Sequence, residues 1–176
     1  MNLFMPLIFV SVVCVVLSLL KRFRTVPILL YHFVDGEGKK RGLSVSFSAF
    51  EQHLQFLLGR NFRVISLGEL VQLLKGKSSQ ALSKMAVISF DDGDKGFYTK
   101  VYPLLVKYQI PAAIFVITDW IGREGYLSWE DINSMSSELV TIGSHTMSHR
   151  YLPELNLDEV RRELVESKRI LEEGYC

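Results

Sequence analysis

The chain has 176 residues, with 20 lysines and arginines against 19 aspartates and glutamates, so its formal net charge is +1. This length allows one domain with a substantial core rather than two. The near balance of charge gives no reason to expect a nucleic acid or a strongly acidic partner. The hydrophobic fraction of 48% is ordinary for a globular protein, but the apolar residues are spread unevenly along the chain.

The first long apolar stretch runs from Leu3 to Leu20 and carries no charge. At about 1.5 Å per residue, a helix of this length reaches roughly 27 Å, close to the hydrocarbon thickness of a bilayer. A buried core segment is one alternative. A cleaved signal peptide is another, but a basic start and a small-residue cleavage site are missing, and Val13 before Cys14 makes a poor lipoprotein site. An uncleaved membrane anchor over residues 1–24, crossing as a transmembrane helix, fits best.

The charges beside this predicted anchor bear on its orientation. Lys21, Arg22 and Arg24 follow it, and positive residues normally stay on the cytoplasmic side. They therefore argue against a location of residues 25–176 on the outer side of the membrane. We predict that residues 25–176 form a single α/β domain. The two cysteines, Cys14 and Cys176, predict no disulfide framework.

After the anchor, short apolar runs alternate with helical patterns. The runs are rich in β-branched residues and are typical of strands buried on both faces: 26–31, 62–66, 85–90, 112–117 and 139–144. Helices are expected to begin near the capping residues Ser48, Ser66, Ser128 and Asn156, and a further helix over 98–108 must be interrupted or restarted at Pro103. In the final helix, an apolar face is predicted from the spacing of Leu157, Val160, Leu164 and Leu171.

Strand–helix alternation of this kind predicts a parallel sheet, either doubly wound or closing into a barrel. Five strands are fewer than the eight or so that typically close such a barrel. An open five-stranded sheet would need helices on both faces and protection of both edges.

Acidic and histidine side chains follow two of the predicted strands. Asp91 and Asp92 come directly after 85–90, and His145 and His149 follow 139–144. Parallel α/β folds bind ligands at the carboxyl ends of their strands, where both pairs are expected. A helical turn over the His-x-x-x-His segment would place both imidazoles on one side, at a spacing suited to a metal ion. Two imidazoles and one carboxylate are a ligand set of catalytic zinc sites, and the other carboxylate would stay ionised as a base.

Each motif alone has a plainer explanation. Asp-Asp-Gly after a strand is common turn chemistry that caps a following helix. His145 alone fits a core residue, and His149 alone fits a solvated one. Their joint occurrence at the ends of two strands of one sheet favours the metal site.

The stretches SFDDG (89–93) and SHTMSH (144–149) resemble the first two motifs of the polysaccharide deacetylases, the NodB-homology family of carbohydrate esterases. The likeness extends over 26–174, with Ser89 in place of the usual threonine. The resemblance implies a distorted parallel (β/α) barrel that hydrolyses acetyl groups on a polysaccharide, most simply an N-acetylglucosamine-type glycan. It also implies that Asp91 is the general base and that Asp92, His145 and His149 bind a divalent metal, usually zinc.

Other residues are weaker candidates. His32 and Asp35, in YHFVDG, resemble the opening strand and loop of members that act on poly-N-acetylglucosamine, and they are candidates for substrate binding. For His32, a hydrogen-bonded loop histidine is the alternative. His53 is expected at the surface. Trp120 and Trp129 could form a sugar platform, although core packing is the better explanation.

The later motifs of the family, including the one that carries its general acid, find no match before Cys176. The general acid is therefore expected outside this sequence, and the chain is interpreted as a deacetylase truncated at its C-terminus, with an incomplete barrel. The alternatives are a non-catalytic remnant that binds metal or glycan without turnover, and a membrane protein with an α/β scaffold. Because polymeric glycans lie outside the membrane, we expect the domain on the outer face of the cell membrane, or secreted if the leader is cleaved.

Overall fold

The computed structural model describes residues 25–35, 42–76, 84–135 and 137–174. Within these ranges the chain forms an α/β fold around a five-stranded parallel sheet, which confirms the predicted fold class at this level. The predicted anchor over residues 1–24 lies outside the described residues. Over the ranges given above, no helix is both long and apolar enough to cross a bilayer.

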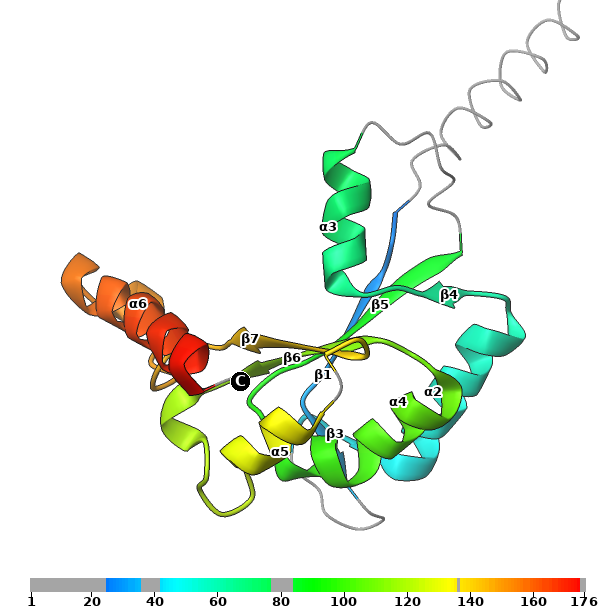
Figure 1. Ribbon diagram of the computed structural model, residues 1–176, viewed down its shortest axis with the longest axis horizontal. Helices are drawn as coiled ribbons and strands as arrows, with labels where there is room; N and C mark the ends of the chain where they lie inside the picture. Colours follow the sequence, from blue (N-terminus) through cyan, green and yellow to red (C-terminus); the bar gives the residue numbers. More distant parts are fainter. Residues whose placement is uncertain (1–24, 36–41, 77–83, 136, 175–176) are drawn as a thin grey trace, which may run out of the picture.

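The main sheet has the order β1-β5-β6-β7, and β4 pairs with the start of β5 (Figure 1). The strands lie within two residues of their predicted bounds: β1 (Ile28–Tyr31), β4 (Arg63–Val64), β5 (Met85–Phe90), β6 (Ala112–Val116) and β7 (Val140–Ser144). The expectation that all of them are buried on both faces is wrong for β1, β4 and β7, each of which has exposed residues. β1 and β7 are the ends of the strand order and β4 is a short strand beside it, whereas every residue of the central β5 is buried.

Two short strands were not predicted. The strands β2 (Phe33–Asp35) and β3 (Ser44–Ser46) pair in parallel as a separate ribbon. Each has only three residues, which is too short for the alternation of apolar and polar residues to stand out in a sequence.

The helices begin largely where capping residues predict. They are α2 (Phe47–Gly59), α3 (Leu67–Lys75), α4 (Tyr102–Tyr108), α5 (Trp129–Ser134) and α6 (Leu157–Gly174). The caps at Ser66, Ser128 and Asn156 are confirmed by their side-chain hydrogen bonds. The cap predicted at Ser48 is wrong. The hydroxyl of Ser46 accepts the hydrogen bond from Ala49 N instead, and α2 begins at Phe47, directly after this cap. Near Pro103, a π-helical turn (Phe97–Val101) gives way to α4, so the helix restarts as predicted.

Aromatic side chains fill the core beneath the sheet. The ring of Phe90 contacts the rings of Phe97 at 4.9 Å, Tyr31 at 5.3 Å and Phe50 at 5.6 Å between centroids. Figure 1 shows α2 and α4 together at one end of the fold and α6 beside β7 at the other. Rigid packing around Phe90 fixes the end of β5, from which the candidate carboxylates emerge.

The final helix buries only part of its predicted apolar face: Leu171 packs against the core and Val160 is half-buried. In α6, Leu157 is 87% exposed and Leu164 is 48% exposed. The buried positions are instead polar, with Glu163 at 3% and Ser167 at 0% exposure. The helix therefore packs on the protein through Leu171 and through two buried polar side chains, which reach the end of β7 and the loop that carries the two histidines.

Candidate metal centre

The two adjacent aspartates lie in a tight turn directly after β5. Asp92 and Gly93 both have left-handed backbone angles, with φ of 72° and 81°. A side chain at Gly93 would also meet Val116 Cγ1 at 3.0 Å, so glycine is needed there for both conformation and space. The turn sends the Asp92 side chain inward, where it is buried, while Asp91 is half-buried. Asp91 N donates to the carbonyl of Tyr31 in β1 at 3.0 Å, which fixes the start of the turn.

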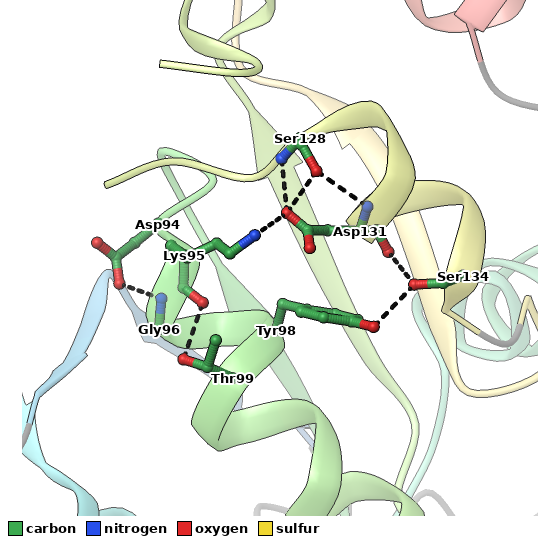
Figure 2. A network of polar contacts seen from close by, with 8 residues as sticks. All are labelled: Asp94, Lys95, Gly96, Tyr98, Thr99, Ser128, Asp131 and Ser134. Atoms are coloured by element: carbon green, nitrogen blue, oxygen red, sulfur yellow. Dashed lines mark hydrogen bonds and ion pairs between the residues drawn. The ribbon is translucent and has the colours of Figure 1, made fainter. Parts of the chain in front are cut away.

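A second set of contacts holds this carboxylate loop (91–95) from the side of α5. Leu127 N donates to Gly93 O at 2.9 Å, and Lys95 N donates to Gly125 O at 2.9 Å. Figure 2 shows the Lys95 ammonium paired with the carboxylate of Asp131, which also closes the capping box of Ser128. Burial alone would raise the pKa of Asp131, but the hydrogen bonds from Lys95 and Ser128 outweigh this effect, and the net pKa lies below its ordinary value.

The two histidines follow β7, but a helical turn does not bring them together as predicted. Thr146 and His149 have left-handed backbone angles, with φ of 67° and 61°. The segment 145–150, here called the histidine loop, is a chain of tight turns, in which His149 N donates to Thr146 Oγ1 at 3.1 Å. His145 N donates to Val116 O at 2.8 Å, which extends the pairing of β6 and β7 to the first imidazole. The prediction that the two imidazoles come together is therefore confirmed, whereas the predicted helical backbone between them is wrong.

A buried carboxylate of α6 supports the histidine loop. Glu163 accepts hydrogen bonds from Met147 N at 3.0 Å, from Ser148 N at 2.8 Å and from the Ser148 hydroxyl. Four residues on, the Ser167 hydroxyl accepts from Ser144 Oγ at 2.7 Å, at the end of β7. Burial alone would raise the pKa of Glu163, but the hydrogen bonds from Ser148 and Met147 lower it below its ordinary value. The carboxylate is thus held in its charged form under the loop.

Sequence reasoning missed Glu163 and Ser167. Their spacing of four residues places them on one face of α6, which is a visible signal. Polar residues on a helix face normally predict contact with solvent, however, and only the position of the histidine loop reverses that expectation.

The two loops bring a carboxylate and two imidazoles together. Asp92 Oδ1 lies 3.6 Å from His145 Nε2 and 3.7 Å from His149 Nε2. One ligand atom from each of the three residues falls within 4.8 Å of the other two. Asp92 Oδ1 is buried, yet it has no hydrogen-bond partner among the described residues. A buried carboxylate oxygen in this state normally requires a partner of opposite charge.

The geometry of this cluster fits a small divalent cation. Zinc binds histidine nitrogen and carboxylate oxygen at about 2.0–2.2 Å, so the ligand atoms of a tetrahedral site lie roughly 3.4 Å apart. The two distances from Asp92 Oδ1 are close to this value. A cation placed among the three atoms would also give the unpartnered oxygen its missing interaction. Three protein ligands leave one tetrahedral position open, which is the arrangement of catalytic rather than structural zinc sites.

The weaker candidates have mixed outcomes. His32 directly follows β1, and the pairing of Tyr31 with Phe90 places it level with Asp91 at the same end of the sheet. Asp35 lies in β2 and accepts a hydrogen bond from Ser44 Oγ at 2.9 Å. His53 is exposed, as predicted, and its Nδ1 lies 3.1 Å from the hydroxyl of Tyr31.

The two tryptophans have different positions. Trp129 packs against the hydrophobic core, as the simpler explanation predicts. Trp120 lies edge-on to the imidazole of His149, with 5.5 Å between ring centroids, and its other neighbour is Tyr126 at 4.8 Å. Trp120 therefore supports one side of the candidate metal centre.

Comparison with known proteins points to one family. The family model described as polysaccharide deacetylase matches residues 78–175, more than half of the chain. The Bacillus subtilis (strain 168) protein YxkH, whose name describes a polysaccharide deacetylase, is 30% identical over 149 residues, covering 85% of this chain and 52% of the relative. The Escherichia coli (strain K12) poly-β-1,6-N-acetyl-D-glucosamine N-deacetylase is 27% identical over 138 residues, covering 69% of this chain and 20% of that protein.

The fold has close counterparts among solved structures. The Streptococcus pyogenes deacetylase PplD, solved in complex with acetate, superposes with a TM-score of 0.77 at 27% identity, covering 85% of this chain and 68% of that one. The chain spans about half the length of the Bacillus relative and a fifth of the Escherichia coli one.

Proposed function

Because the chain belongs to the polysaccharide deacetylase family, we propose that its metal centre serves the hydrolysis of acetyl groups on a polysaccharide. The observation that carries this proposal is the cluster of Asp92, His145 and His149 around an unpartnered carboxylate oxygen, with Asp91 beside it. The alternative of binding without turnover is not favoured, because a second carboxylate adjacent to a three-ligand centre is what hydrolysis needs and what mere binding does not.

We infer that Asp92, His145 and His149 hold one divalent cation, with zinc as the best match to two imidazoles and one carboxylate. When bound, such a cation would polarise the acetyl carbonyl and make a water more acidic. The protein contributes the fixed placement of the three ligands, through the carboxylate loop on one side and the histidine loop with Glu163 on the other.

Asp91 is proposed as the general base. It precedes the ligand Asp92 directly and is half-buried at the same end of the sheet. A carboxylate in this position can take a proton from the water that attacks the acetyl carbon. Its backbone is fixed by the hydrogen bond to Tyr31 O, so the side chain starts from a defined position.

His32 is retained as a candidate for substrate binding. It directly follows β1 and lies level with Asp91 at the same end of the sheet, so its imidazole could contact a glycan bound at the metal centre.

A test of His32 is the KM for an N-acetylglucosamine oligosaccharide. Replacement by alanine should raise KM, and a variant that keeps the wild-type KM would overturn this role.

The substrate class is proposed from the relatives. Proteins named poly-β-1,6-N-acetyl-D-glucosamine N-deacetylase align with most of this chain, which supports an N-acetylglucosamine-type glycan and cleavage of a carbon–nitrogen bond that is not a peptide bond. Asp35, in β2 close to His32, is retained as a candidate for substrate binding, with its carboxylate positioned by Ser44.

The wider architecture and location are also proposals. The parallel order β1-β5-β6-β7 supports the distorted (β/α) barrel of this family. For residues 1–24 we propose a membrane anchor that places residues 25–176 on the outer face, where acetylated polymers lie. A reporter that is active only outside the membrane, fused after residue 45, tests this orientation. An inactive fusion would contradict it and would agree with the positive charge of Lys21, Arg22 and Arg24.

The experiment that tests the catalytic proposal is the replacement Asp91→Asn. Acetate release from an N-acetylglucosamine oligosaccharide should fall by at least about a hundredfold, the lower range of general-base catalysis, while the bound metal remains. Acetate release at the wild-type rate would show that Asp91 is not the base.

A further inference from the structure

A hollow opens directly beside the candidate metal centre. Its wall runs from His145 and His149 to Tyr151, Leu152 and Pro153, and it has a volume of about 470 Å³. This volume falls within the range of small-molecule sites. Because two of the three metal-binding residues form one side of it, any ligand in the hollow would lie next to the reacting acetyl group.

The wall of the hollow also carries an exposed aromatic ring. Tyr151 is 68% exposed, whereas large aromatic side chains are usually covered. Leu152 and Pro153 continue the wall with apolar surface. The face of a sugar ring that carries its C–H bonds is apolar, and its hydroxyls lie around the rim. Such a ring fits flat against a tyrosine, while the hydroxyls stay in water.

The charges around the hollow favour a neutral ligand. Among the described residues, Arg150 is the one charged side chain of this wall outside the metal centre, and its guanidinium is paired with Glu159 at 3.1 Å. An anionic ligand would have to compete with that carboxylate. An uncharged N-acetylated sugar would not.

The histidine side of the hollow is held in place without a ligand. The histidine loop is fixed through Ser148 and Met147 by the buried carboxylate of Glu163. A preformed site avoids the entropy cost of ordering a loop on binding.

We propose that this hollow is a glycan subsite in which Tyr151 stacks on the sugar unit next to the one that loses its acetyl group. The proposal rests on the proposed deacetylase function and specifies how that function selects a polymer over a single sugar. Tyr151 is thus a specificity-determining residue, separate from the residues that carry out the reaction.

The test compares two substrates in the full-length protein loaded with zinc: N-acetylglucosamine and its β-1,6-linked trimer. Tyr151→Ala should lower kcat/KM for the trimer by roughly three- to tenfold, the range of one aromatic stacking contact, mainly through KM. The loss on the single sugar should be smaller, because a single sugar does not reach the subsite. Tyr151→Phe keeps the ring and should keep the preference for the trimer.

Leu157→Ala serves as the matched control, because it removes another exposed apolar side chain at 87% exposure and should leave both substrates unaffected. An unchanged trimer-to-monomer ratio in Tyr151→Ala would overturn the subsite while the deacetylase proposal stands. A wild-type protein that releases acetate from neither sugar would instead overturn the proposed function, and the subsite with it.

Discussion

Replacing Glu163 tests whether a buried carboxylate of α6 holds the histidine loop in place. In Glu163→Ala, Met147 N, Ser148 N and the Ser148 hydroxyl lose their shared acceptor. A hydrogen bond to a charged group contributes about 1.5–3 kcal/mol. Taking the low end for each bond, and allowing for water that reaches the half-buried loop afterwards, the free energy of unfolding should fall by about 3 kcal/mol.

Glu163→Gln should have a smaller effect. The amide keeps one oxygen for the two backbone donors, and its NH₂ group can donate to the Ser148 hydroxyl. The charge is lost while the shape is kept, so we expect a decrease of about 1 kcal/mol. Both variants should also bind zinc more weakly, by about 10- to 100-fold, because groups that position metal ligands typically have effects of this size.

The assays are urea unfolding in the presence of a chelator and zinc titration against a competing chelator. Glu166→Gln is the matched control: it lies on the same helix, is paired with Arg169 at 2.9 Å and is more exposed, so its effect should stay within about 0.5 kcal/mol. The reasoning is refuted if Glu163→Ala matches Glu166→Gln in both stability and zinc affinity.

Three further predictions concern pH, the turn after β5 and the support of the carboxylate loop. Folding lowers the pKa of Glu163, so the charged carboxylate stabilises the folded protein at neutral pH. This stabilisation is lost as the pH falls from 4.5, the ordinary pKa, through the lower pKa of the folded state. Below pH 4.5 the free energy of unfolding should therefore fall more steeply in the wild type than in Glu163→Gln, and parallel curves would argue against this. Gly93→Ala should lower the free energy of unfolding, measured with urea, by about 2–3 kcal/mol, because Gly93 has a left-handed φ and the Val116 side chain lies close to it. Gly68→Ala in α3 is the control: a methyl group fits there without a close contact, so this substitution should not destabilise the protein. Asp131→Ala should lower the free energy of unfolding by about 2 kcal/mol, since it removes a capping box and the buried partner of the Lys95 ion pair. Lys95→Met should lower it less, because the Lys95 side chain is partly exposed. Equal effects of the two substitutions would contradict the role of Asp131 in the capping box.

Much of the candidate site follows from the sequence because two simple rules place it. Apolar β-branched runs locate the strands, and parallel sheets gather the residues that follow their strands at one edge. Asp91 and Asp92 after β5, and His145 and His149 after β7, obey both rules. The convergence of Asp92 with the two histidines is therefore predictable without knowledge of the turns between them.

The remaining features depend on contacts that sequence spacing does not contain. Leu157 and Leu164 of α6 are exposed although their spacing predicts an apolar face, and Glu163 and Ser167 are buried instead. These two side chains accept hydrogen bonds from the histidine loop and from Ser144 at the end of β7. The left-handed angles at Thr146 and His149 likewise replace the expected helical turn. In both places, hydrogen bonds between segments that are distant in the sequence or within tight turns determine the structure, and the spacing of residues along the chain does not reveal them.

The most direct test of the metal centre is the number of zinc ions bound per chain in the wild type and in Asp92→Asn. The ligand geometry of Asp92, His145 and His149 predicts one tightly bound ion in the wild type. Loss of the Asp92 carboxylate should weaken that binding by orders of magnitude, because it removes the one negative ligand of the set. A wild-type chain that binds no zinc, or an Asp92→Asn variant that binds it as tightly as the wild type, would contradict this account.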